Sequence, residues 1–339
     1  MDELVSSASF LIVGVGLLAV FLTWLMRRYA LSSMFLDWPN ARSSHSVPTP
    51  RGGGVAIVAA FVVGVLVSGP VFDVAVPWRM IEAGIGVATV GLIDDRSHIP
   101  ARWRLVAHFF CAGWILYSIG IPPLDWLDRT IDLGPFGALL AALYLVWMLN
   151  LYNFMDGIDG IAGVEALTAG MGGALIYTLG GGSLTDGWLP AALLAAAAAG
   201  FLVWNFPPAR IFMGDVGSGF LGLMLGALSL QAAVEQPVLL WCWLVLLGVF
   251  VVDATVTLVR RILRREQVYE AHCSHAYQHA SREFEAHRPV TLAVAAINLF
   301  WLLPWAIAIA LGYVAGLVGL VVAYIPLLIL AFRFKAGMP

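Results

Sequence analysis

Apolar residues fill most of the chain in long continuous runs, and short polar segments rich in Gly, Pro and charged residues separate them. A helix needs about 20 mostly apolar residues to cross the hydrocarbon core of a bilayer. Roughly eleven runs approach this length by the same criterion, and ten spans are an alternative because several runs are short or glycine-rich. The runs cover residues 9–26, 55–68, 80–93, 105–121, 136–149, 161–179, 189–204, 216–233, 238–259, 290–311 and 314–332. Continuous rather than alternating apolar character favours an all-α polytopic membrane protein over a β-barrel.

The charged residues give this bundle an orientation. With eleven spans the termini lie on opposite sides, and one set of loops carries all but two of the 18 Lys and Arg residues. The other set holds only Arg79 and Arg129. The positive-inside rule places the basic set in the cytoplasm, so the N-terminus is predicted to be periplasmic and the C-terminus cytoplasmic.

The composition supports the same class. Hydrophobic residues make up 61% of the chain and charged residues 12%, which excludes an ordinary soluble enzyme, a disordered chain and a nucleic-acid-binding domain. We therefore expect one membrane domain over residues 1–339, in which 260–289 is the longest cytoplasmic loop. Small residues in 191–200 would let two copies pack closely, which favours a homodimer.

The first two cytoplasmic loops carry candidate chemistry. Residues 37–54 combine Arg42, His45 and Arg51 with three glycines before a helix, a pattern typical of anion binding at a helix N-terminus. The alternative is a basic loop that only sets topology. Adjacent carboxylates at Asp94 and Asp95 favour a divalent cation, a cationic partner or a raised pKa on one of them, whereas an interfacial pair neutralised by a nearby arginine is the bland interpretation.

A third loop places Asp156 and Asp159 three residues apart, on one face if the segment is helical. Asn153 adds a neutral oxygen, and oxygen ligands without sulfur suit Mg²⁺ or Mn²⁺. A tight Asp-Gly turn is the alternative.

The last two loops also have two interpretations each. Asp215 opens a predicted helix, where it either caps the helix or holds a metal, and Phe212 either stacks on a base or marks the membrane interface. His272, His275 and His279 have the spacing of one helix face, which would suit zinc or a diphosphate, or else they are surface residues.

Taken together, the loops resemble those of the polyprenyl-phosphate N-acetylhexosamine-1-phosphate transferase superfamily, the MraY/WecA family (glycosyltransferase family 4). The resemblance covers essentially the whole chain and rests on five motifs in order, followed by His272-x-x-His275 in the final cytoplasmic loop. The motifs are Asp37-x-Pro-Asn40-x-Arg42-x-x-His45, Pro48-Thr-Pro-Arg51-Gly-Gly-Gly54, Gly91-x-x-Asp94-Asp95, Asn153-x-x-Asp156-Gly-x-Asp159-Gly160 and Phe212-Met-Gly-Asp215-x-Gly-Ser218.

The resemblance implies a Mg²⁺-dependent enzyme (Mn²⁺ as the alternative) in the bacterial inner membrane. It would move a sugar-1-phosphate from a UDP-amino sugar to undecaprenyl phosphate and release UMP. By this resemblance Asp215 and Asn153 hold the metal, and Asp215 is also catalytic. Asp94 and Asp95 orient or deprotonate the lipid phosphate, Asp156 and Asp159 shape the nucleotide pocket, and Phe212 stacks on uracil. The diphosphate is held by His272, His275 and Arg51, and the substrate-binding residues also include Asn40, Arg42 and His45.

The final loop departs from two branches of the family. It reads His-Cys-Ser-His, whereas the phospho-MurNAc-pentapeptide transferases carry consecutive histidines and the GlcNAc branch carries its own His-x-His pattern. The first loop looks most like members that use 6-deoxy-N-acetylhexosamines to initiate O-antigen synthesis. Phospho-MurNAc-pentapeptide and GlcNAc-1-phosphate transfer are the alternatives within the family.

A cation transporter is the alternative of another class, because acids at membrane edges also mark ion paths. A transporter should place its ionisable groups near the bilayer midplane. Here the acids cluster in loops on one side, with Asp253 near the cytoplasmic end of the ninth run as the main exception.

Overall fold

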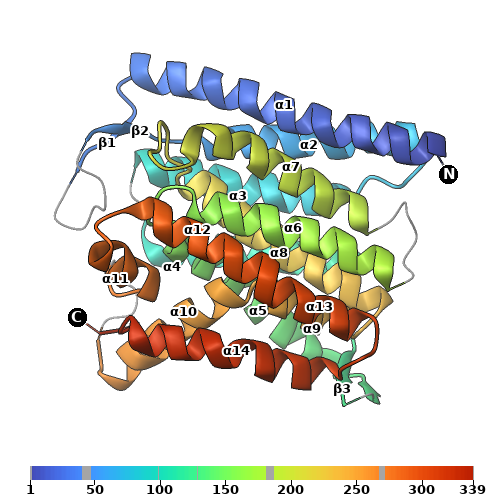
Figure 1. Cartoon of the computed structure of the whole chain (residues 1–339). Coiled ribbons are helices and arrows are strands. Elements are labelled where there is room, and N and C mark those ends of the chain that lie inside the picture. The colour runs from blue at the N-terminus through green and yellow to red at the C-terminus, as the bar shows by residue number, and fades with distance from the viewer. Residues whose placement is uncertain are drawn as a thin grey trace.

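The apolar runs of the sequence fold as long helices that lie side by side in a computed structural model (Figure 1). The structure describes residues 2–39, 47–97, 99–127, 129–180, 187–266 and 272–338. Asn40, Arg42 and His45 lie outside the described residues, so their predicted roles stay predictions. The fold class predicted from the sequence is confirmed.

The elements follow one another along the chain with short connections. The first half contains α1 (Asp2–Ser32), β1 (Leu36–Asp37), β2 (Thr49–Pro50), α2 (Gly54–Phe72), α3 (Trp78–Arg96), α4 (Ala101–Ile119), β3 (Leu124–Trp126), β4 (Arg129–Ile131) and α5 (Gly134–Met155). The second half contains α6 (Ile161–Leu179), α7 (Trp188–Asn205), α8 (Asp215–Glu235), α9 (Leu239–Leu246), α10 (Gly248–Leu263), α11 (Ala276–Glu283), α12 (His287–Ile297), the π-helical turn η1 (Asn298–Leu302), α13 (Leu303–Ala310) and α14 (Gly316–Arg333). Strands β1 and β2, and likewise β3 and β4, form small antiparallel pairs.

Each of the eleven predicted runs is helical, and one of them is bent. Within the described residues eight helices are long and apolar enough to cross a membrane, or nine if a bent pair counts as one span. The bent pair is α9 and α10, which meet at 74° around Leu247. The run 238–259 is therefore a broken helix, a feature that continuous hydropathy does not reveal.

Helix α8 is the centre of the bundle, because almost all of its residues are buried. It packs against α5 and α3, and small residues allow the close approach. A Cβ at Gly222, for example, would lie 2.6 Å from the carbonyl oxygen of Met148 on α5. The N-terminus of α8 is consequently fixed by its neighbours on several sides.

The small residues of α7 pack inside this chain rather than on its surface. A Cβ at Gly200 would lie 2.3 Å from the carbonyl oxygen of Gly16 on α1, and one at Gly170 on α6 would lie 2.9 Å from the carbonyl oxygen of Ala191. The stretch 191–200 therefore serves the α1–α7 and α6–α7 contacts. The sequence argument for a homodimer loses its basis, since those residues are already in contact with neighbouring helices.

The two ends of the bundle differ in content. Figure 1 places the N-terminus and β3 at one end, and β1, β2, α11 and the C-terminus at the other. This arrangement agrees with the prediction that the termini lie on opposite sides. The end that holds α11 also gathers the motif-bearing loops, and we call it the loop end.

Candidate active site

The N-terminus of α8 organises the site. Asp215 is the first residue of this helix, and the preceding Gly214 adopts a left-handed φ of 76° with no side-chain cap of its own. The carboxylate of Asp95 provides the cap instead, since it accepts from the backbone N–H of Asp215 at 3.0 Å and of Val216 at 3.4 Å. Of the two interpretations of Asp215, helix capping is therefore excluded, because the end of α3 supplies the acceptor and leaves the Asp215 side chain facing the site.

Glycines make this approach of α3 to α8 sterically feasible. A Cβ at Gly91 would lie 2.5 Å from the carbonyl oxygen of Asp215, and one at Gly54 would lie 2.3 Å from the Cα of Gly217. Real Cβ atoms do not tolerate such distances, so only glycine allows the backbones to meet. Gly54 of the second motif and Gly91 of the third thus have a physical reason in the geometry around Asp215.

Arg51 joins the two carboxylates. Its guanidinium lies 2.7 Å from Asp95 and 3.0 Å from Asp215. Burial alone would lower the pKa of this guanidinium, but Asp95 and Asp215 together raise it above its ordinary value. The Asp95 side chain is fully buried, at 0% exposed, whereas that of Asp215 is 25% exposed. Of the two acids, Asp215 is therefore the one that can meet a ligand directly.

The loop that carries Phe212 is hydrogen-bonded to the segment around Arg51. The Phe212 N–H donates to the carbonyl of Pro50 at 2.8 Å, and the Gly53 N–H donates back to the carbonyl of Phe212 at 2.9 Å. Phe212 is half-buried, and its backbone is joined to the segment that carries Arg51. Its contact with uracil stays a prediction.

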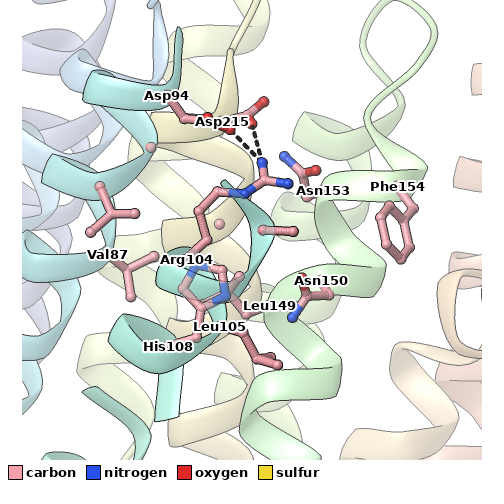
Figure 2. Close-up of a pocket in the computed structure, with 14 residues that line it drawn as sticks. Val87, Asp94, Arg104, Leu105, His108, Leu149, Asn150, Asn153, Phe154 and Asp215 are labelled. Carbon is pink, nitrogen blue, oxygen red and sulfur yellow. Dashed lines mark hydrogen bonds and ion pairs between the residues drawn. The ribbon is translucent and has the colours of Figure 1, made fainter. Parts of the chain in front are cut away.

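A pocket of about 220 Å³ opens beside Asp215, between α3, α4, α5 and α8. Figure 2 shows Arg104 pointing from α4 toward Asp94 and Asp215, to which it is ion-paired. The Arg104–Asp215 distance is 3.7 Å. Below these charges the lining is largely apolar and includes Val87 and Leu105. The pocket therefore has Arg104 between two carboxylates at its head and a mostly apolar stem, which also holds His108.

The end of α5 completes the acid cluster. Asn153 lies in the last turn of α5, donates to Ser218 Oγ at 3.0 Å and hydrogen-bonds the Asp215 carboxylate. Asp156 follows as the C-cap of α5, and burial together with the negative charge of Asp215 raises its pKa well above the ordinary value. Asp156 and Asp159 do not share a helical turn as expected, because α5 ends before the first and α6 begins after the second.

Asp159 holds three segments together. One carboxylate oxygen accepts from the Ala209 N–H at 2.9 Å, and the other lies 3.2 Å from Nδ1 of His287 at the start of α12. The Thr291 hydroxyl donates to the Asp159 carbonyl at 2.7 Å. Asp159 thus holds the loop that carries Asp156, and its role in the nucleotide pocket stays a prediction. His287 is a partner that the sequence did not single out.

The final loop brings His272 and His275 against the end of α5. Their rings stack with centroids 4.9 Å apart, and the His275 ring lies 6.4 Å from that of Phe154. Asp253 on α10 fixes this loop, because its carboxylate accepts from the backbone N–H groups of Ala276 and Tyr277 at 2.9 and 3.0 Å. The same carboxylate lies 3.3 Å from Nδ1 of His275. Nε2 of His275 is buried and has no hydrogen-bond partner.

His279 points elsewhere. It lies inside α11, whereas His275 precedes that helix and His272 is not helical, so the three histidines do not share one helix face. Its Nε2 lies 3.2 Å from the carbonyl of Met338. The C-terminal tail, residues 335–338, is also bound by the final loop and α10: the Gly337 N–H donates to the Ser274 carbonyl at 2.7 Å, and Arg260 donates to the Ala336 carbonyl at 2.7 Å.

The donor set fits a hard cation held jointly with a ligand. Among the described residues no three His, Cys, Asp or Glu side chains converge on one point, so zinc has no site of the usual kind there. Asp215 and Asn153 offer adjacent oxygens, and Mg²⁺ typically binds one or two protein oxygens together with substrate phosphates. The carboxylates of Asp94, Asp95, Asp156 and Asp215 also outnumber the two arginines that pair with them. This excess of negative charge suits a divalent cation.

The structure brings most of the predicted residues to the loop end. Arg51 joins Asp95 to Asp215, Arg104 joins Asp94 to Asp215, and Asn153 hydrogen-bonds Asp215. Asp156 lies within the same electrostatic cluster. Sequence reasoning missed Arg104, because only the turn between α3 and α4 brings it back to Asp94. It also passed over Glu165, a fully buried acid in the second turn of α6, which is a further exception to the clustering of acids in loops.

These features define a class: a polytopic membrane protein with a clustered acid–arginine site at one end of its bundle. Residues 78–233 match the glycosyl transferase family 4 model. The chain is 30% identical to a decaprenyl-phosphate N-acetylglucosaminephosphotransferase of Mycolicibacterium smegmatis, with 93% of this chain and 88% of the relative covered. It is 29% identical to a probable undecaprenyl-phosphate N-acetylglucosaminyl 1-phosphate transferase of Bacillus subtilis, over 85% and 81% of the two chains. It is 33% identical to a phospho-N-acetylmuramoyl-pentapeptide-transferase of Moorella thermoacetica, with 63% of this chain and 70% of the relative covered.

The chain belongs to glycosyl transferase family 4 and is a transferase of the bacterial membrane. The superfamily predicted from the five loop motifs is thereby confirmed. The transporter alternative is set aside, since the relatives are named as transferases and the acid cluster lies at one end of the bundle.

Proposed function

We propose that the protein transfers an N-acetylhexosamine-1-phosphate from a UDP-sugar to undecaprenyl phosphate. An oxygen of the lipid phosphate attacks the β-phosphorus of the UDP-sugar, the bond between that phosphorus and the bridging oxygen breaks, and UMP leaves with the bridging oxygen. The relatives named above act on polyprenyl phosphates by name, which supports this reaction class.

One observation carries the proposal: the pocket beside Asp215 places Arg104, together with the proposed metal ligand Asp215, over a mostly apolar stem. A polyprenyl phosphate has the complementary form, with one anionic end and a hydrocarbon chain. Arg104 would hold the phosphate, and the apolar walls would exclude water from the first isoprene units. Asp94 accepts from the Ile99 N–H at 2.7 Å and pairs with Arg104, so in this proposal it sets the position of the guanidinium.

The diphosphate of the donor would lie on the other side of Asp215. Arg51 and the His272–His275 loop supply cationic and hydrogen-bonding groups there, and Phe212 supplies a face for uracil. We propose that Asp215 and Asn153 hold Mg²⁺, which when bound would neutralise charge on the diphosphate. Phosphoryl transfer depends chiefly on such positioning and charge neutralisation, which is what this set of residues can provide.

We further propose that the donor is a 6-deoxy-N-acetylhexosamine and that the product initiates O-antigen or a related surface polysaccharide. The support is the form of the first loop, Pro48-Thr-Pro-Arg51, and the departure of the final loop from the patterns of the two alternative branches. GlcNAc and MurNAc-pentapeptide donors remain the competing substrates, and both are named among the relatives.

The test is UMP release by the purified full-length protein in detergent with undecaprenyl phosphate. The donor panel is UDP-QuiNAc, UDP-FucNAc, UDP-GlcNAc and UDP-MurNAc-pentapeptide. We expect Mg²⁺- and lipid-dependent UMP from a 6-deoxy donor, abolished by EDTA and restored by added Mg²⁺. Asp215→Asn should lose activity, whereas Asp132→Asn at the opposite end of the bundle is the matched control and should retain it. Turnover of UDP-GlcNAc alone would overturn the sugar assignment, and no turnover of any donor by folded protein would overturn the reaction.

A further inference from the structure

Glu165 is an acid inside the bundle for which the transfer chemistry has no use. It lies in the second turn of α6 and is 0% exposed. Asn298 donates from Nδ2 to Glu165 Oε2 at 2.7 Å, and the same nitrogen lies 2.8 Å from Thr168 Oγ1. Ionisable groups inside membrane bundles are expensive to bury, so a specific role is the default expectation.

The partners of Glu165 come from two places where a membrane helix is irregular. Asn298 is the first residue of the π-helical turn η1, between α12 and α13. The backbone N–H of Phe250, in the first turn of α10 just after the 74° bend, lies close to the same carboxylate. First-turn N–H groups lack partners within their own helix, and a half-helix N-terminus attracts a carboxylate. Glu165 therefore fastens the broken span to α6 and to η1 at one point.

The position of α10 in turn determines the position of the final loop. Asp253 lies one turn beyond Phe250 and holds the start of α11 through the N–H groups of Ala276 and Tyr277. The Phe250 ring also packs on that of Tyr152 at the end of α5, with centroids 5.0 Å apart. A shift of α10 at Glu165 would consequently be transmitted to His275 over a single helical turn.

We propose that Glu165 is a positioning residue that sets the orientation of α10 and, through Asp253, holds the His272–His275 loop beside the donor diphosphate. The role of that loop in donor binding rests on the proposed function, whereas the coupling of Glu165 to the loop through α10 does not depend on it. Glu165 Oε1 and Asn298 Oδ1 are both buried without a hydrogen-bond partner. A glutamine at position 165 would keep an oxygen that accepts from Asn298 Nδ2, and its N–H group could donate to Asn298 Oδ1. The conservative variant should therefore preserve the coupling.

The kinetic test compares Glu165→Gln and Glu165→Leu in the full-length protein. We expect Glu165→Leu to raise KM for the UDP-sugar about tenfold, as for loss of an outer-shell partner, with KM for the lipid phosphate little changed. Glu165→Gln should stay within about twofold of wild type, since it retains the hydrogen bond. Ser229→Ala is the matched control, because it removes a buried hydroxyl that pairs with Tyr144 on other helices. An equal rise of both KM values in Glu165→Leu, or a Gln variant as impaired as the Leu variant, would overturn the proposal.

A second readout is independent of turnover. Cys273 lies within the final loop and is partly exposed, whereas Cys111 and Cys242 are buried. We expect maleimide labelling of Cys273 to change severalfold in rate in Glu165→Leu and in the milder Asn298→Ala, and to match wild type in Glu165→Gln and Ser229→Ala. Wild-type labelling in both disrupting variants, with both folded, would refute the coupling. If wild type shows no turnover while the labelling pattern appears, the proposed function fails and the coupling stands.

Discussion

The acid–arginine cluster and the His272–His275 loop lie at the same end of the bundle but are positioned by different means. Around Asp215 the backbones of three segments touch at glycines, and a Cβ at Gly54 or Gly91 would meet backbone atoms at 2.3–2.6 Å. The His loop is held by hydrogen bonds to the Asp253 carboxylate and to the C-terminal tail. Backbone contact fixes a group by excluded volume, whereas hydrogen bonds can exchange with water. We infer that the acids are set rigidly by the fold and that the histidines can be displaced without loss of the fold.

The largest expected effect comes from adding a methyl group to the rigid region. Gly91→Ala would place a Cβ 2.5 Å from the Asp215 carbonyl oxygen, and overpacking of this kind commonly costs about 1–3 kcal/mol or more. We expect at least a hundredfold loss of UMP release, because a displacement of about 1 Å at a reacting centre can have that effect.

Gly113→Ala on α4 is the control, since a Cβ there meets nothing within 4 Å. It should behave as wild type in size-exclusion profile and activity. Wild-type activity in Gly91→Ala would show that the α3–α8 contact is not a positioning contact.

The neighbouring carboxylates Asp94 and Asp95 provide the next test, since they should respond to different measurements. Asp95 is fully buried and accepts from Arg51 and two N–H groups of α8. Removing one partner of a buried ion pair typically destabilises by about 3–5 kcal/mol, so Asp95→Asn should lower the thermal unfolding temperature markedly. Asp94 has one cationic partner, Arg104, and no role in capping α8, and Asp94→Asn retains an acceptor for Ile99, so this variant should lower the unfolding temperature less than Asp95→Asn while raising KM for undecaprenyl phosphate. Equal unfolding temperatures for the two variants would contradict this division.

The same contrast explains what could be predicted from the sequence. Hydropathy located eleven apolar runs, each of which is helical, because length and apolarity are local properties of the chain. The residues of the acid cluster were also predicted, through the resemblance of five loop motifs in order, because each loop taken alone had a structural alternative. The sequence did not reveal that Asp95 caps α8 or that Arg104 pairs with Asp94, because both contacts depend on how α3, α4 and α8 pack.

The break between α9 and α10 was missed for a related reason. No proline or polar residue marks Leu247, and the run 238–259 reads as one apolar segment. The acceptor that meets the new helix N-terminus is Glu165, which is distant in sequence. Tertiary partners of this kind stabilise irregular backbone inside a membrane protein, and no local pattern encodes them.

A smaller effect is expected within the His loop itself. His275 stacks between His272 and Tyr277 next to Phe154, whereas His279 faces the C-terminal tail. We expect His275→Ala to raise KM for the UDP-sugar about tenfold, within the range for a residue that binds a charged ligand. His279→Ala should change the same KM about twofold at most, since it removes one hydrogen bond to a backbone carbonyl. Initial rates over a donor titration distinguish the two, and the reverse order would show that α11 rather than the loop before it meets the donor.

The smallest effect concerns the tail that holds the loop from outside. Gly337 has a φ of +73°, and a Cβ there would lie 2.8 Å from Arg260 Cβ and 2.9 Å from the Thr257 carbonyl oxygen. Gly312 has a φ of +74° with nothing within 4 Å of an added Cβ, so Gly312→Ala carries the same backbone strain without the clash. Strain of this kind amounts to about 1 kcal/mol in both variants. Any loss of stability in Gly337→Ala beyond that in Gly312→Ala therefore measures how firmly the C-terminal tail is docked.

Because the Gly337 N–H donates to the Ser274 carbonyl, loosening the tail should free the neighbouring Cys273. We expect Gly337→Ala to speed maleimide labelling of Cys273 about two- to fivefold, as for loss of one or two hydrogen bonds. Gly312→Ala should label at the wild-type rate. Acceleration without a change in the UDP-sugar KM would mean that the tail protects the loop but does not place it, which would leave Asp253 as the group that positions His275.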